Sequence, residues 1–244
     1  MTVVLQVIGV TRRFSGLVAV DDVSFSLHRR EILGLIGPNG AGKTTLVSLI
    51  SGTIPPSSGE ILFESRPITT LQAFRRGRLG IARTFQIMRP FPGLSVLDNV
   101  AVGALFGRDG GRRTLAQARE MAREQLEFVG LGQVIERRAD ELGGPGRKRL
   151  ELAKALAMDP KILLCDEVMA GLNHVEIDEV IDVIRRVRDR GISVLVIEHV
   201  IKAIKSLSDR LLVLHHGEKI ADDTPEAVLS DPRVIQAYLG GRRE

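Results

Sequence analysis

The chain has 244 residues, of which 44% are hydrophobic and 26% are charged, and 34 basic and 30 acidic side chains give a formal net charge of +4. This composition is typical of a globular protein with one large domain or one domain that carries an insertion. The sequence contains no run of about 18 apolar residues, so it predicts no transmembrane helix. The lone Cys165 excludes an internal disulfide and is expected to be a small buried side chain. Arginine clusters occur at residues 75–78, 112–113 and 147–149, but aromatic residues are sparse, with no Trp and a single Tyr, which argues against nucleic-acid binding.

The first 85 residues are predicted to form short strands around one helix. A turn near Ser15 and Gly16 separates the first two strands, and a Pro- and Ser-rich connection precedes the fourth. A short basic helix is expected at residues 71–78. Apolar runs and alternation indicate strands at residues 3–8, 18–27, 32–36, 59–63 and 81–85.

A glycine-rich loop joins the strand at residues 32–36 to a helix that begins near Lys43. The loop residues are Gly37, Pro38, Asn39, Gly40, Ala41, Gly42, Lys43, Thr44 and Thr45. The glycines let backbone N–H groups converge on phosphate oxygens, and the helix N-terminus adds its positive end. Lys43 is expected to reach the β- and γ-phosphates, and the Thr44 hydroxyl to bind Mg²⁺. This strand–loop–helix order predicts a P-loop that binds a nucleoside triphosphate, rather than an ordinary glycine-rich turn.

Residues 87–156 differ in character from the rest of the chain. Prolines and a glycine at residues 90–93 interrupt the pattern, and helix-forming residues then dominate. We interpret this segment as a helical insertion. Within it, residues 115–129 predict an amphipathic helix with apolar residues at Leu115, Met121, Leu126 and Val129.

After residue 156 strands and helices alternate again. Helices are expected at residues 175–190 and 201–208, and strands at residues 161–166, 192–197 and 211–214, the last one in a hairpin across residues 216–218. The predicted fold class is therefore α/β: a P-loop NTPase core with a mostly parallel sheet, an N-terminal antiparallel β section and a helical insertion. We expect a single domain over residues 1–244, with residues 1–86 and 157–244 as the catalytic core and residues 87–156 as the helical subdomain.

Polar side chains follow three of the predicted core strands. Asp166 and Glu167 end one strand, His199 follows the next, and Gln86 closes the strand at residues 81–85. Because parallel strands place their carboxyl ends at one edge, these residues are expected beside the P-loop. Asp166 suits a Mg²⁺ site, Glu167 could polarise the attacking water, His199 could orient it, and Gln86 could reach Mg²⁺ or water. The alternative for the acidic pair is a set of surface salt bridges.

The order of these motifs resembles the ATP-binding subunit of an ABC transporter, over essentially the whole chain. The resemblance implies that Gln86 is the Q-loop, residues 170–173 are the D-loop and His199 is the switch histidine. It also implies that Phe14 stacks on adenine. Residues 83–86, 91–100, 166–173 and 197–200 resemble the branched-chain (hydrophobic) amino acid uptake branch in particular. The ending at residues 234–240 also resembles a lipopolysaccharide-export ATPase, so it discriminates poorly.

One loop departs from the family pattern. The family signature is Leu-Ser-Gly-Gly-Gln, and the resemblance implies that this loop caps the γ-phosphate bound by the opposite subunit. Gly143 has no hydroxyl and Pro145 has no N–H, and each lost charge-assisted hydrogen bond is expected to weaken the ATP-bound dimer by about 1.5–3 kcal/mol. The residues at the signature positions that are still expected to contact the opposite nucleotide are Leu142, Gly143, Gly144 and Gly146.

The resemblance implies ATP and Mg²⁺ as ligands and a second ATP-binding subunit, identical or a paralogue. It also implies transmembrane permease subunits, received by a groove near residues 86–100, and indirectly a periplasmic or extracellular substrate-binding protein. The expected location is the cytoplasmic face of the cell membrane, as a peripheral protein. Three alternatives stay open at this point: a lipid or lipopolysaccharide exporter, a non-transport ABC ATPase of DNA repair or translation, and a module that binds nucleotide without hydrolysis.

Overall fold

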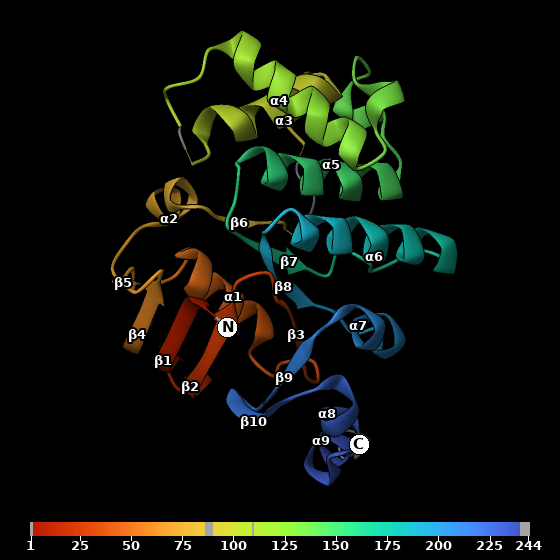
Figure 1. The fold of residues 1–244 in the computed structure, drawn as a ribbon. Helices are drawn as coiled ribbons and strands as arrows, with labels where there is room; N and C mark the ends of the chain where they lie inside the picture. Colours follow the sequence, from red (N-terminus) through yellow and green to blue (C-terminus); the bar gives the residue numbers. More distant parts are fainter. Residues whose placement is uncertain (1, 86–89, 109, 240–244) are drawn as a thin grey trace.

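The computed structural model describes residues 2–85, 90–108 and 110–239 (Figure 1). Within these residues the strands form two sheets, with strand orders β2-β1-β4-β5 and β10-β9-β3-β8-β7-β6. The elements follow in the order β1 (Val3–Phe14), β2 (Leu17–His28), β3 (Ile32–Ile36), α1 (Lys43–Ser51), β4 (Ser58–Phe63), β5 (Arg66–Pro67), α2 (Ala73–Leu79), β6 (Ile81–Arg83), α3 (Val96–Phe106), α4 (Leu115–Phe128), the short 3-10 helices η1 (Gly132–Val134) and η2 (Ala139–Glu141), α5 (Gly144–Ala157), β7 (Ile162–Asp166), α6 (His174–Asp189), β8 (Ser193–Ile197), α7 (Ile201–Leu207), β9 (Arg210–His215), β10 (Glu218–Asp223), α8 (Pro225–Ser230) and α9 (Pro232–Leu239).

The larger sheet positions the site. Strands β3, β7 and β8 are buried along their whole length, which explains their continuous apolar sequences. They pair in parallel, with Leu35 opposite Ile197 between β3 and β8, and Asp166 opposite Ile197 between β7 and β8. The three strands therefore end at the same edge of the sheet, as the sequence predicts. The predicted α/β fold class, with an antiparallel N-terminal sheet, is confirmed.

Three details of the predicted elements are wrong. The first strand does not stop at residue 8: β1 continues to Phe14, because the pairing with β2 shifts register around Gly9, whose φ is +56°, and then resumes. The predicted strand at residues 81–85 ends as β6 at Arg83. In the predicted amphipathic helix, Leu115 is 51% exposed, whereas Leu126 and Val129 are buried as predicted. Ala118 and Ala122 of α4 are fully buried as well, which allows close approach of the neighbouring helices.

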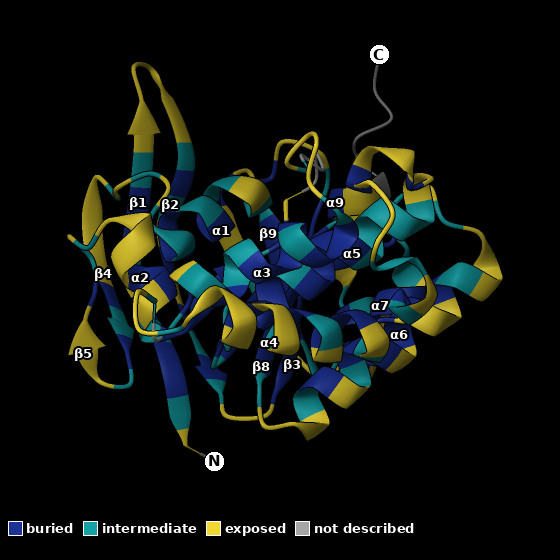
Figure 2. Ribbon diagram, turned by 90° about the horizontal axis from the view of Figure 1, so that it is seen from above, coloured by how far each residue is buried: buried dark blue, intermediate teal, exposed yellow. Residues whose placement is uncertain are grey.

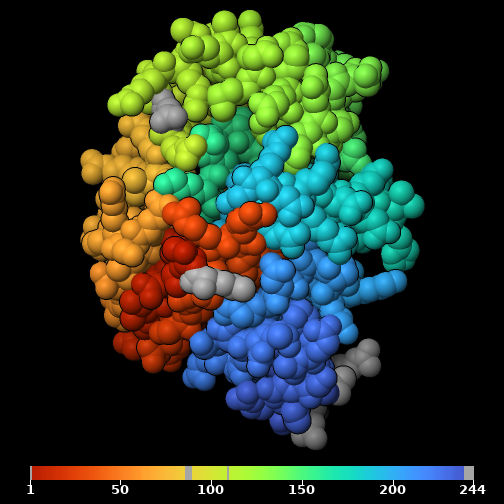
Figure 3. Space-filling model, in the orientation of Figure 1, coloured from red at the N-terminus to blue at the C-terminus, as the bar shows by residue number. Residues whose placement is uncertain are grey.

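Helices α3, α4 and α5 gather at one end of the molecule, and the C-terminal α8 and α9 lie at the opposite end (Figures 1 and 3). Helix α3 is the inner one, with six buried residues, while α4 exposes its outer face (Figure 2). None of the described helices is long and apolar enough to cross a membrane.

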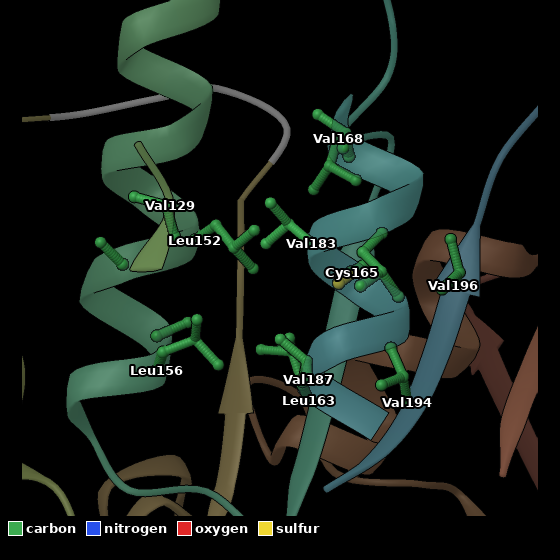
Figure 4. Close-up of a cluster of buried hydrophobic side chains, with 14 of the residues drawn as sticks. Val129, Leu152, Leu156, Leu163, Cys165, Val168, Val183, Val187, Val194 and Val196 are labelled. Atoms are coloured by element: carbon green, nitrogen blue, oxygen red, sulfur yellow. The ribbon is translucent and has the colours of Figure 1, made fainter. Parts of the chain in front are cut away.

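A shared core joins this helical layer to the larger sheet. Leu152 and Leu156 of α5 face Val183 and Val187 of α6, with Cys165 of β7 beside them (Figure 4). Cys165 is fully buried, and burial raises the pKa of its thiol far above the usual range, so it is the small apolar side chain that its position predicts. One continuous core includes residues on both sides of the predicted boundaries at residues 87 and 156. The division of the chain into a catalytic core and a helical subdomain therefore stays a prediction.

One buried cation fastens α1, the helix that follows the P-loop. The Arg76 side chain of α2 is 1% exposed, and its guanidinium donates to the carbonyls of Leu49 and Ile50 in the last turn of α1, at 2.7 and 2.9 Å. It also donates to the carbonyls of Thr69 and Leu71, at 2.8 and 2.9 Å. Burial lowers the pKa of Arg76 to about 10. Arg76 therefore satisfies C-terminal carbonyls of α1 that have no partner within the helix.

Replacing Arg76 with Met is expected to lower the free energy of unfolding by about 2–4 kcal/mol, because four carbonyls lose a charged donor in a buried place. Urea denaturation followed by circular dichroism measures the change. The matched control is Arg75→Met, at an exposed neighbour on the same helix, which should change stability by less than about 0.5 kcal/mol. Equal stabilities of the two variants would contradict this role of Arg76.

Candidate nucleotide-binding site

The P-loop backbone requires glycine at specific positions. Gly37, Gly40 and Gly42 have φ values of +150°, +78° and +100°. A Cβ atom at Gly37 would lie 2.2 Å from the carbonyl oxygen of Leu214, and one at Gly42 would lie 2.3 Å from the carbonyl oxygen of Ala19. The loop is therefore packed directly against the backbones of β9 and β2, and only residues without a Cβ fit there.

Lys43 is held at the loop as the first residue of α1. Its Nζ donates to the carbonyl oxygens of Gly37 and Pro38, at 2.7 and 2.8 Å. Burial lowers the pKa of Lys43, and the nearby carboxylates of Glu167 and Asp166 oppose this effect by favouring the ammonium form. The structure thus brings the P-loop lysine and the acidic pair after β7 into one electrostatic environment, as expected from the strand ends.

Asp166 is 2% exposed and is oriented by two neighbours from β6 and the residue after it. Its Oδ2 accepts from the Arg83 guanidinium at 2.8 Å, and its backbone N–H donates to the Thr84 hydroxyl at 3.1 Å. Its Oδ1 has no hydrogen-bond partner among the described residues, although it is buried. A buried carboxylate oxygen without a partner, on the same sheet edge as the exposed Thr44 hydroxyl, fits a hard divalent cation such as Mg²⁺.

Glu167 begins a tight turn after β7. Its φ is +51°, a left-handed conformation that is uncommon for a residue with a side chain. Its N–H donates to the carbonyl of Ile197 at 3.0 Å, and its own carbonyl accepts from Lys148 Nζ at 3.3 Å. Contacts from β8 and α5 therefore hold this residue in its strained conformation.

The remaining predicted residues are placed as follows. His199 is exposed and lies two residues after the end of β8, on the edge that carries Asp166. Phe14 ends β1, is 39% exposed, and has the Arg12 guanidinium 4.5 Å from its ring centroid. Gln86 lies outside the described residues. A cavity of about 690 Å³ beside the loop is lined by residues 38–41, the β9–β10 hairpin and α9, but not by Asp166 or Glu167.

The signature-like loop forms the start of α5. Gly143 is the N-cap residue and makes no side-chain cap, and Pro145 lies in the first turn. Arg147 closes the loop by donating to the carbonyls of Leu142 and Asp140, at 2.7 and 2.8 Å. The hydrogen bonds described for residues 142–146 stay within this region, so the structure does not join the loop to the P-loop of the same chain.

Sequence reasoning missed the supporting residues Arg83, Thr84, Lys148 and Glu198. Arg83 and Thr84 adjoin a strand end, and Glu198 adjoins His199, so proximity to a strand end was a usable signal for these three. Nothing in the sequence marks Lys148, because its partners lie 19 and 22 residues away in another element.

The fold and the site define a P-loop protein of the α/β class that binds a nucleoside triphosphate. Residues 20–170 match the family model described as ABC transporter, and the chain belongs to this family, whose ATP-binding subunits bind and hydrolyse ATP. Residues 218–244 match a second model, described as branched-chain amino acid ATP-binding cassette transporter.

Several relatives are similar along nearly their whole length. The chain is 36% identical to the high-affinity branched-chain amino acid transport ATP-binding protein BraF of Pseudomonas aeruginosa, covering 97% of this chain and 98% of that protein. It is 37% identical to LivG of Escherichia coli strain K12, named for the same transport, covering 97% of each chain. Among solved structures, the ADP conformation of MJ1267, an ATP-binding cassette of an ABC transporter, has a TM-score of 0.89 at 29% identity, covering 98% of this chain and 100% of that one.

Replacing Gly42 with Ala is expected to lower the free energy of unfolding by more than about 2 kcal/mol and to abolish nucleotide binding, because the added methyl group meets the Ala19 carbonyl. Gly40→Ala is the matched control: it also has a positive φ but meets nothing within 4 Å, so it should cost only about 1 kcal/mol. Thermal unfolding without nucleotide and titration with a fluorescent ATP analogue measure both effects. Equal destabilisation by the two substitutions would show that the Ala19 contact is unimportant.

Proposed function

We propose that this chain is the ATP-hydrolysing subunit of an importer for branched-chain amino acids. The observation that supports hydrolysis is that β3, which leads into the P-loop, and β7, which leads into Asp166 and Glu167, end at one sheet edge, where the two carboxylates favour the ammonium form of Lys43. The import assignment is supported by the match of residues 218–244 and by relatives named for that transport. The alternative is export of a lipid or lipopolysaccharide, because residues 234–240 also resemble a lipopolysaccharide-export ATPase.

In this proposal the loop N–H groups and the Lys43 ammonium bind the β- and γ-phosphates of ATP. The hydrogen bonds from Lys43 to the carbonyls of Gly37 and Pro38 hold the ammonium at the loop. Thr44 and Asp166 are the residues that would hold Mg²⁺, together with Gln86, and the bound ion would neutralise phosphate charge. Arg83 occupies Oδ2 of Asp166, so Oδ1 is the oxygen open to the ion.

Glu167 is the proposed general base. It accepts a proton as the water oxygen attacks the γ-phosphorus, and the bond from that phosphorus to the bridging oxygen of ADP breaks. The proton then passes to the released phosphate, which leaves Glu167 ionised for the next cycle. His199 donates a hydrogen bond to the γ-phosphate and orients the water, and Phe14 stacks on the adenine.

The site is proposed to be completed by a second ATP-binding subunit, identical or a paralogue. The loop at Leu142, Gly143, Gly144 and Gly146 would cap the γ-phosphate bound by that subunit, with the N-terminus of α5 pointing at the anion. The pair would bind transmembrane permease subunits at the cytoplasmic membrane face, through a surface near residues 86–100. A substrate-binding protein would deliver the amino acid on the other side.

Replacing Glu167 with Gln is expected to abolish ATP hydrolysis and to leave ATP affinity within about twofold, because the amide keeps the shape but cannot accept the proton. Phosphate release and titration with a fluorescent ATP analogue measure the two properties. The exposed Glu120→Gln variant is the control and should keep full turnover. Substantial turnover in Glu167→Gln would contradict the assignment of the base.

The same variant tests the physiological role. Deleting the gene in the native organism is expected to lower uptake of radiolabelled leucine, isoleucine and valine. Wild-type protein should restore the uptake and Glu167→Gln should not. Unchanged uptake, together with altered outer-membrane lipid, would contradict import and support export.

Restoring the signature is expected to strengthen the ATP-bound dimer. A Cβ atom at Gly143 meets nothing within 4 Å, so serine fits there without strain. In the Glu167→Gln background, Gly143→Ser with Pro145→Gly should lower the dimer dissociation constant at saturating ATP by about tenfold or more, through regained hydrogen bonds. Sedimentation velocity measures it. Gly16→Ser, at another open position, is the control, and an unchanged dimer constant in the restored variant would refute the idea.

A further inference from the structure

A cluster of charged residues contacts the turn that begins at Glu167. The proposed chemistry does not use this cluster. It joins three segments that are far apart in the sequence: Lys148 from α5, the 167–170 turn after β7, and Glu198 after β8. The turn leads directly into the D-loop at residues 170–173. Each segment also carries a motif of the nucleotide site, since α5 begins with the signature-like loop and Glu198 precedes His199.

Lys148 crosses from the helical layer to the turn. Its Nζ donates to the carbonyl oxygen of Ala170 and, at 3.3 Å, to that of Glu167. Burial lowers the pKa of Lys148, and the negative charges of Glu198 and Glu167 oppose this effect. One ammonium group of α5 therefore contacts the carbonyls at both ends of the turn, and the Glu167 carbonyl also accepts from the N–H of Ala170 at 3.3 Å.

Glu198 holds the same turn from the opposite element. It is 1% exposed, and its Oε1 accepts from the N–H of Met169 at 2.7 Å. Its Oε2 has no hydrogen-bond partner among the described residues. Burial raises the pKa of Glu198 to about 7, while the Met169 N–H and the Lys148 charge oppose the rise. Keeping a carboxylate in this buried place requires the nearby ammonium.

The turn needs such support because of its backbone. The left-handed φ of +51° at Glu167 sets the direction in which the carboxylate leaves the sheet edge. The N–H of this residue donates to Ile197 of β8, and its carbonyl accepts from Lys148 of α5 as well as from Ala170 within the turn. A movement of α5 relative to the sheet would therefore be transmitted through Lys148 to the residue proposed as the general base.

We propose that Lys148 and Glu198 are positioning residues that couple the signature helix α5 to the 167–170 turn, so that the placement of Glu167 depends on the state of α5. The inference rests on the proposed function, in which Glu167 hydrolyses ATP and the start of α5 caps the nucleotide of the second subunit. Through this link, occupancy of one ATP site changes the competence of the other. Such coupling is reciprocal in binding free energy.

The experiment uses the wild-type protein and five variants. Lys148→Met keeps the apolar stem and removes the donors, Lys148→Arg keeps the charge, and Glu198→Gln keeps an acceptor for Met169 but removes the charge. The double variant Lys148→Met with Glu198→Gln measures the coupling. Arg149→Met is the matched control, because Arg149 is the next residue of α5 but pairs with Glu179 of α6. Each protein is tested for kcat, ATP affinity and melting temperature.

Lys148→Met and Glu198→Gln should each lower kcat by about tenfold or more with ATP affinity within about twofold, and the double variant should be no slower than the slower single one. Lys148→Arg should recover most of the turnover, and Arg149→Met should match wild type. Three results would each overturn the proposal. The first is an unchanged kcat in Lys148→Met, and the second is a loss of kcat that only follows a lower melting temperature or a lower ATP affinity. The third is additive effects in the double variant.

If Lys148→Met does not fold, the variants Lys148→Arg and Glu198→Gln test the proposal instead. A wild-type kcat in Glu198→Gln overturns it. A tenfold loss of kcat in Glu198→Gln, with wild-type turnover in Lys148→Arg, supports it. Wild-type protein whose hydrolysis does not depend on Glu167 would instead refute the proposed function itself. The two failures are therefore distinguishable.

Discussion

The interaction on which the site depends is the pairing of the buried Asp166 carboxylate with the Arg83 guanidinium. A charge with 2% exposure needs a partner, and removing one member of such a pair is usually costly. The Arg83 guanidinium also donates to the hydroxyl of Ser48 in α1, at 3.0 Å. One side chain of β6 therefore fixes the end of β7 against the helix that follows the P-loop. The relative positions of the phosphate-binding and acidic parts follow from this contact.

The N-terminal antiparallel sheet supports the same site from the other side. The carbonyl of Ala19 in β2 packs so closely on Gly42 that no Cβ fits between them. The N–H of Asp21 donates to the carbonyl of Gly217, at the turn between β9 and β10, at 2.9 Å. The P-loop is thus enclosed by backbone from both sheets, and its shape depends on segments more than 170 residues apart in the chain.

The sequence predicted those features that are encoded locally. Apolar runs were enough to locate β3, β7 and β8, and the glycine spacing was enough to locate the P-loop. It failed where tertiary contacts decide the outcome: β1 continues through a bulge at Gly9, and Leu115 of α4 is exposed while Ala118 and Ala122 are buried. The roles of Lys148 and Glu198 could not be predicted, because neither residue has a local pattern and their partners come from other elements.

The departure at the signature positions and the charged cluster at the turn that begins at Glu167 concern the same helix. With glycine as its N-cap and proline in its first turn, α5 lacks a hydroxyl and one N–H, but it keeps its dipole and the N–H groups of Gly144 and Gly146. A weaker grip on the opposite nucleotide would leave α5 freer to shift between two positions. The link from Lys148 to the Glu167 carbonyl would then matter more in this chain than in one with the full signature, since in the proposed dimer the helix that would cap one phosphate would also place the proposed base for the other.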